Sequence, residues 1–134
     1  MLQSRQQTKT AQQSLRILVV EDERDVLDML REVLEGEGHA VIAVPDGESA
    51  LAYFQAQPFD IVFTDLYMPV FSGWDVAGRI KKLNSSVPVV LLTGCDVEFE
   101  QAELKIRGID CFIKKPFTIA AVLQALVDLC GPRK

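Results

Sequence analysis

The chain has 134 residues, of which 49% are hydrophobic and 25% are charged, and its net charge is −5. This length and composition are those of one ordinary globular domain with a sizeable core. Because the chain is acidic and has no basic block, we expect it not to bind nucleic acid. Its apolar runs are too short to cross a bilayer and no signal peptide begins the chain, so we expect a cytoplasmic protein without membrane attachment.

Residues 1–14 are polar and predict a disordered arm or linker. We expect one domain over residues 15–131 and a short tail over 132–134. Within the domain, short apolar runs alternate with helical patterns, and these runs predict strands at 16–20, 39–44, 60–64, 88–92 and 110–114. This alternation, with short connections, predicts a doubly wound α/β sheet with right-handed crossovers.

The predicted helices follow the strands and carry their own end signals. Asp46 and Thr118 are expected to begin the second and fifth helices, since a side-chain oxygen at that position can accept a backbone N–H. Gly36 and Gly108 are expected to end the first and fourth helices, where glycine is common.

Polar residues stand at the ends of four of the predicted strands. Glu21 and Asp22 follow the first strand, Asp65 follows the third, Thr93 the fourth and Lys115 the fifth. In a parallel sheet all strands end along one edge, where ligands bind. We therefore expect carboxylates, a hydroxyl and an ammonium to converge there, in a set that can hold a hard cation and a phosphoryl group.

The acidic residues predict a metal site. Glu21, Asp22 and Asp65 offer only oxygen ligands, without His or Cys, which favours Mg²⁺ or Mn²⁺ over zinc. The alternative is an acidic helix start that suits the helix dipole. That alternative accounts well for Glu23 and poorly for Asp22.

Asp65 is the candidate nucleophile, because a carboxylate can attack phosphorus and become an acyl phosphate. Thr93 and Lys115 can bind the phosphoryl oxygens. Taken singly, these residues could instead open a turn, cap a strand end or lie on the surface. The bond between Lys115 and Pro116 is a candidate cis peptide, which would turn the lysine side chain inward.

These motifs are similar to those of the receiver domains of two-component response regulators, over about residues 16–130. Each motif is weak alone, but together they stand in the family's order and spacing. They are Val20-Glu21-Asp22-Glu23, Asp65-Leu66-Tyr67-Met68-Pro69 with Gly73, Thr93-Gly94, Gly108-Ile109-Asp110, and Phe112 with Lys115-Pro116-Phe117.

The resemblance implies a flavodoxin-like (βα)5 three-layer sandwich with parallel sheet order 2-1-3-4-5. It implies that Asp65 accepts a phosphoryl group from a phosphohistidine on a histidine kinase or phosphotransfer protein. Asp22, Asp65 and the backbone carbonyl of Tyr67 would hold Mg²⁺, or Mn²⁺, with Glu21 helping through water.

By the same resemblance, Thr93 and Lys115 would bind the phosphoryl oxygens. Thr93 and Phe112 would act as the switch that changes the surface. We thus expect a self-phosphorylating and self-dephosphorylating switch rather than an enzyme with a separate catalytic domain.

Several positions depart from the commonest family pattern. Glu21 stands where Asp is more usual, and Phe112 lacks the hydroxyl of the commoner Tyr. Tyr67 and Cys95 occupy the two positions that tune loss of the phosphoryl group in the family. Our hypothesis is that Tyr67 shields the acyl phosphate from water.

The partners are predicted less specifically. We expect a downstream protein target or an output domain. The fifth helix has apolar residues over a wide arc, which fits either deep burial or a partner surface. The family often pairs through the fourth helix, fifth strand and fifth helix, so a homodimer through that face is one expectation.

Three alternative functions can be compared with the sequence. A nucleotide or flavin binder would need a glycine-rich phosphate loop, and the chain has none. An Asp-nucleophile phosphatase usually has a second acid where this chain has Tyr67. A degenerate receiver, acting as a protein-interaction module without phosphorylation, would lack some of the side chains that are present here.

Overall fold

The computed structural model describes residues 14–94 and 99–131. Apart from Ser14, the predicted arm lies outside this part, as do Cys95 and the predicted tail. Ser14 is tied to the domain, because its hydroxyl donates to the carbonyl of Gly38 over 2.8 Å. The elements are β2 (Arg16–Val20), α1 (Arg24–Gly36), β3 (Ala40–Val44), α2 (Gly47–Ala56), β4 (Ile61–Asp65), α3 (Gly73–Leu83), β5 (Val89–Thr93), α4 (Gln101–Ile106), β6 (Cys111–Lys114) and α5 (Ile119–Cys130).

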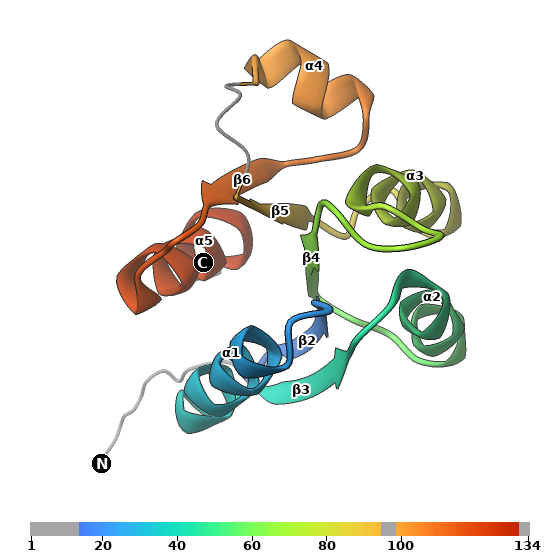
Figure 1. The fold of residues 1–134 in the computed structure, drawn as a ribbon. Helices are drawn as coiled ribbons and strands as arrows, with labels where there is room; N and C mark the ends of the chain where they lie inside the picture. Colours follow the sequence, from blue (N-terminus) through green and yellow to red (C-terminus); the bar gives the residue numbers. More distant parts are fainter. Residues whose placement is uncertain (1–13, 95–98, 132–134) are drawn as a thin grey trace.

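The five strands form one parallel sheet in the order β3-β2-β4-β5-β6. This confirms the predicted order 2-1-3-4-5, and the predicted strand limits agree with the structure to within one residue. Helices α1 and α5 lie on one face of the sheet, and α2 and α3 lie on the other (Figure 1). The result is the predicted three-layer sandwich.

Strand residues alternate between two hydrophobic clusters. In β2, Ile17 and Val19 belong to the cluster that includes Leu30 of α1 and Val122 of α5. Leu18 belongs to the other cluster, with residues of α2, α3 and α4. Because successive side chains of a strand point to opposite faces, a sheet covered by helices on both faces needs strands that are apolar throughout.

The helix starts and the end of the first helix follow the prediction. Asp46 accepts the backbone N–H of Ser49 over 2.7 Å, and Thr118 accepts that of Ala121. Gly36 is the last residue of α1, as predicted, and the left-handed residue that follows the helix is Gly38, with φ of 95°. None of the helices in the described ranges is long and apolar enough to cross a membrane.

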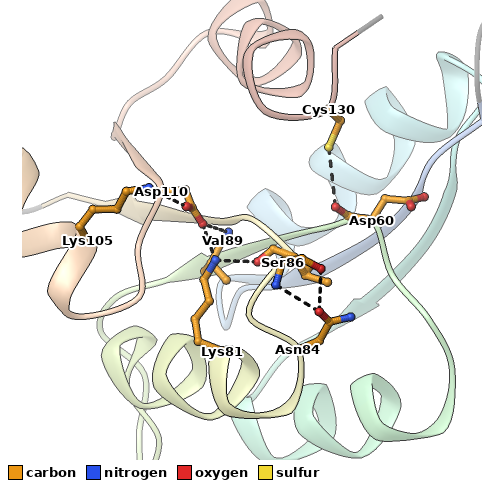
Figure 2. Close-up of polar contacts among 9 residues, drawn as sticks. Asp60, Lys81, Asn84, Ser86, Val89, Lys105, Asp110 and Cys130 are labelled. Atoms are coloured by element: carbon orange, nitrogen blue, oxygen red, sulfur yellow. Dashed lines mark hydrogen bonds and ion pairs between the residues drawn. The ribbon is translucent and has the colours of Figure 1, made fainter. Parts of the chain in front are cut away.

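At the edge of the sheet where the strands begin, Asp110 makes a cluster of polar contacts just before β6 (Figure 2). Its carboxylate accepts the backbone N–H of Val89 and the ammonium of Lys81, each over 2.8 Å. Lys105 of α4 lies 3.5 Å from the same carboxylate. This cluster therefore joins α3, α4 and the starts of β5 and β6.

Gly73 begins α3 at a point of close contact with the end of β4. A Cβ atom there would collide with the carbonyl oxygen of Asp65 and lie 2.8 Å from Cδ1 of Leu91. Gly78, in the same helix, has no neighbouring atom within 4 Å of such a Cβ. Close approach of α3 to the sheet thus depends on Gly73 and not on Gly78.

We predict that Gly73→Ala lowers the free energy of unfolding by about 1–3 kcal/mol, because the backbone of β4 must shift to admit the methyl group. Gly78→Ala is the matched control and should raise stability by about 0.5–1 kcal/mol, since alanine favours the helix. Urea denaturation of both variants checks this. Equal stability of the two would contradict the packing argument.

Candidate functional site

The predicted site residues lie where the strands end. Glu21 follows β2, Asp65 is the last residue of β4, Thr93 is the last of β5, and Lys115 follows β6. Glu21, Asp65 and Thr93 are all buried, with exposed fractions of 0%, 6% and 1%. Buried polar groups at strand ends are costly unless they have partners, so their contacts matter.

Three of the predicted ligands come together in the structure. One carboxylate oxygen each from Glu21, Asp22 and Asp65 lies within 4.8 Å of the other two. Glu21 and Asp65 are buried, whereas Asp22 is exposed at the rim. Asp65 also accepts the backbone N–H of Leu66 over 2.9 Å, which fixes one of its oxygens.

Lys115 supplies the positive charge. Its ammonium lies 2.9 Å from Glu21 Oε1 and 3.5 Å from Asp65 Oδ1. The first contact is an ion pair without hydrogen-bond alignment, so Glu21 Oε1 is buried without a hydrogen-bond partner. The peptide bond between Lys115 and Pro116 is cis, as predicted.

Glu23 is a member of this cluster that the sequence analysis assigned only to the helix start. Its carboxylate lies 3.6 Å from the Lys115 ammonium, and its backbone N–H donates to Glu21 Oε2 over 3.0 Å. The sequence feature that could have predicted this contact is the position of Glu23, two residues after Glu21 and directly before α1. Glu23 is largely exposed, so this contact contributes little to stability.

The surroundings of Asp65 disfavour its charged form. Burial and the negative charge of Glu21 raise the pKa of Asp65, and a hydrogen bond with Asp22 adds to this. Lys115 and the Leu66 N–H act in the opposite direction, and the net effect raises the pKa from 3.8 to about 7. Burial alone would lower the pKa of Lys115, but its carboxylate neighbours, Glu21 foremost, raise it overall.

These residues fit a divalent cation. The three carboxylate oxygens are close together, one buried oxygen of Glu21 has no hydrogen bond, and Asp65 resists ionisation. A hard cation with oxygen ligands would relieve all three conditions. The single ammonium of Lys115 balances only part of the negative charge.

The loop between β4 and α3 contributes Tyr67, which is 64% exposed. The loop turns sharply at Val70, where φ is +71°, a value that β-branched residues rarely adopt. The turn is closed by the Phe71 N–H, which donates to the Pro69 carbonyl over 2.8 Å. It lets the chain return to Gly73, against the end of β4.

The family model of the response regulator receiver domain matches residues 17–127. The chain belongs to that family. This receiver domain is 39% identical over 110 residues to the sensory transduction protein RegX3 of Mycolicibacterium smegmatis, covering 82% of this chain and 48% of that protein. It thus spans about half the length of the curated relatives that it matches.

Solved structures give the same assignment. This receiver domain superposes on the chemotaxis protein CheY4 of Vibrio cholerae with a TM-score of 0.81 and 26% identity, covering 87% of this chain and 99% of that one. It superposes on response regulator TrrA of Thermotoga maritima with a TM-score of 0.76 and 32% identity, covering 86% and 98%. The TrrA structure is a complex with Mg(2+)-BeF.

We predict that Asp65→Asn stabilises the metal-free receiver domain at pH 8 by on the order of 1–3 kcal/mol. Between pH 3.8 and about 7 the folded chain holds a proton on Asp65 that the unfolded chain releases. The wild type therefore loses stability as pH rises through this window, and the variant does not. Urea unfolding in EDTA from pH 4 to 8 measures the difference.

The control is Asp25→Asn, which removes an exposed acid in the first turn of α1. Its stability difference from wild type should not change over the same pH window. Added Mg²⁺ should stabilise wild type more than Asp65→Asn. A difference between wild type and Asp65→Asn that is independent of pH would contradict the effect assigned to burial.

Proposed function

We propose that Asp65 is the phosphoacceptor of this receiver domain in two-component signal transduction. The observation that supports this most directly is its carboxylate, buried at the end of β4, beside two further carboxylates and 3.5 Å from the Lys115 ammonium. The carboxylate is placed to attack an incoming phosphoryl group, and the ammonium is placed to bind its oxygens. The family assignment supplies the reaction class.

In the proposed transfer, an Asp65 carboxylate oxygen attacks the phosphorus of a phosphohistidine. A new P–O bond forms, the P–N bond breaks, and the imidazole nitrogen leaves with the electron pair. Lys115 and Thr93 stabilise the phosphoryl oxygens. Water later attacks the phosphorus and releases inorganic phosphate, which restores the carboxylate and makes the domain a self-resetting switch rather than a classical enzyme.

Glu21, Asp22, Asp65 and the Tyr67 carbonyl would hold the divalent cation. When bound, Mg²⁺, or Mn²⁺ in its place, screens the repulsion between the carboxylate and the phosphoryl group. The complex of TrrA with Mg(2+)-BeF supports this assignment by analogy. In this chain the three carboxylates within 4.8 Å of one another support it directly.

Thr93 and Phe112 form the proposed switch. Thr93 is buried at the end of β5, and Phe112 is half-buried on the neighbouring strand β6. Phosphorylation of Asp65 adds about one negative charge beside Thr93. A shift of Thr93 toward that charge would open space into which the Phe112 ring can move.

The proposed partners are a histidine kinase or phosphotransfer protein as donor, and a protein target or output domain as receiver of the signal. A cytoplasmic location, predicted from the sequence, fits such a relay. Ile106, Ile119 and Val127 are exposed by 85%, 48% and 54%. These apolar side chains on α4 and α5 support a contact surface, including a homodimer, over α4, β6 and α5.

The rival functions find less support. An Asp-nucleophile phosphatase would need an acid where Tyr67 stands, two residues after Asp65. A degenerate receiver would not need the arrangement of Asp65, Lys115 and the two further carboxylates that the structure contains. The bounds of the functional unit, residues 15–131, remain our proposal and include the 17–127 match.

We predict one Mg²⁺-dependent, base-labile phosphoryl adduct when the protein is incubated with acetyl phosphate, because an acyl phosphate hydrolyses in base. Intact-mass spectrometry should find it in wild type and in Asp25→Asn, and not in Asp65→Asn. An adduct on folded Asp65→Asn would place the acceptor elsewhere. A folded wild type without any adduct would favour the degenerate receiver.

We also predict that Tyr67→Ala loses the phosphoryl group at least about threefold faster than wild type, since removing the ring admits water to the acyl phosphate. Tyr53→Ala, which removes another exposed tyrosine, is the control and should leave the rate unchanged. The rate is measured as decay of the adduct mass after the donor is removed. Equal decay in Tyr67→Ala and wild type would refute the shielding hypothesis.

A further inference from the structure

Phe112 is in contact with a chain of aromatic rings that the proposed function does not use. Its ring centroid lies 5.6 Å from that of Phe99 at an interplanar angle of 76°. Phe99 in turn lies 5.4 Å from the ring of Trp74 at 82°. The Arg107 guanidinium carbon lies 3.9 Å above the Trp74 ring. We call these four residues the aromatic column.

The column joins three separate elements. Phe112 lies on β6 and Trp74 near the start of α3, while Phe99 and Arg107 flank α4 on its two sides in sequence. Trp74 is therefore in contact with Phe99, just before α4, and with Arg107, just after it. The contacts on both sides of α4 thus meet on one indole ring.

Within residues 14–94 and 99–131, few other contacts hold helix α4 in place. It is six residues long, and its buried side chain is Leu104. In the described part of the chain, α4 also makes an ion pair through Lys105, whose ammonium lies 3.5 Å from the carboxylate of Asp110 and whose side chain is largely exposed. A helix with so few buried contacts depends on the aromatic column for its position.

The geometry of the rings makes these contacts directional. Edge-to-face pairs at these separations are favoured by the aromatic quadrupole, and a guanidinium over an indole ring is attracted in the same way. The three rings are only partly buried and pack on the outside of one core cluster. They can therefore change position without opening the core.

We propose that Phe99 and Trp74 are positioning residues that couple the switch residue Phe112 to helix α4. This inference rests on the proposed function, because it requires the Phe112 ring to respond to phosphorylation of Asp65. A contact present in one state and absent in the other biases the balance between the two states. Movement of Phe112 would remove its edge-to-face contact with Phe99, and so change the environment of Trp74.

The chain contains a single tryptophan, so its emission reports on the column without further labelling. Wild-type protein is incubated with acetyl phosphate and Mg²⁺, and tryptophan emission, acrylamide quenching and intact mass are measured on the same samples. We expect the emission of Trp74 to change in proportion to the phosphoryl adduct. The same samples of Asp65→Asn should show neither change.

Phe99→Leu removes the ring that joins Trp74 to Phe112 and keeps an apolar side chain. We expect it to form the adduct while its emission change per adduct falls by at least about threefold, because the ring that would transmit the movement of Phe112 to Trp74 is absent. Phe99→Tyr keeps the ring and should restore the response. Phe99→Met replaces the leucine variant if the latter does not fold.

Phe54→Leu is the matched control, because Phe54 also belongs to a ring pair, with Phe59 at 6.1 Å, but is outside the aromatic column. It should respond as wild type does. An adduct on wild type without an emission change, or an undiminished change in Phe99→Leu, would overturn the coupling while the proposed function stands. No adduct on wild type would overturn both, and intact mass separates the two failures.

Discussion

Carboxylates at the end of a buried sheet repel one another, and much of this molecule is arranged around that repulsion. Glu21, Asp22 and Asp65 bring three oxygens within 4.8 Å of one another, and Lys115 offers one ammonium to Glu21, Glu23 and Asp65. Burial removes the water that would screen these charges. The site is therefore short of positive charge, and this shortage makes it receptive to a divalent cation.

The same shortage accounts for the raised pKa of Asp65. A carboxylate that is neutral for part of the time is a poor nucleophile, so the proposed cation would serve both to ionise Asp65 and to admit an anionic phosphoryl group. Stability and function oppose each other at this residue. Such opposition is common at functional sites, which have perturbed groups where a purely structural site would have satisfied ones.

Packing around the site is rigid on one side and adaptable on the other. Gly73 brings α3 against the end of β4 without space for a methyl group, which fixes Asp65. Helix α4, by contrast, has one buried side chain and packs beside the partly buried aromatic column. A rigidly held Asp65 and a loosely held α4 in one domain suit the proposed switch, because a local change of charge can then alter the surface without disturbing the core.

The sequence by itself determined the fold and most of the candidate site. Uniformly apolar strands alternating with amphipathic helices admit few arrangements other than a doubly wound sheet, and residues directly after such strands must meet at one edge. For that reason the positions of Asp22, Asp65 and Lys115 in the sequence were enough to predict that they lie together. Only the tertiary structure decided the contacts that depend on the exact separation of elements. These are the pairing of Glu23 with Lys115, the left-handed turn at Gly38 after α1, and the column from Phe112 to Trp74. Residues 74, 99 and 112 come from three separate parts of the chain, and no local pattern in the sequence encodes the distance between them.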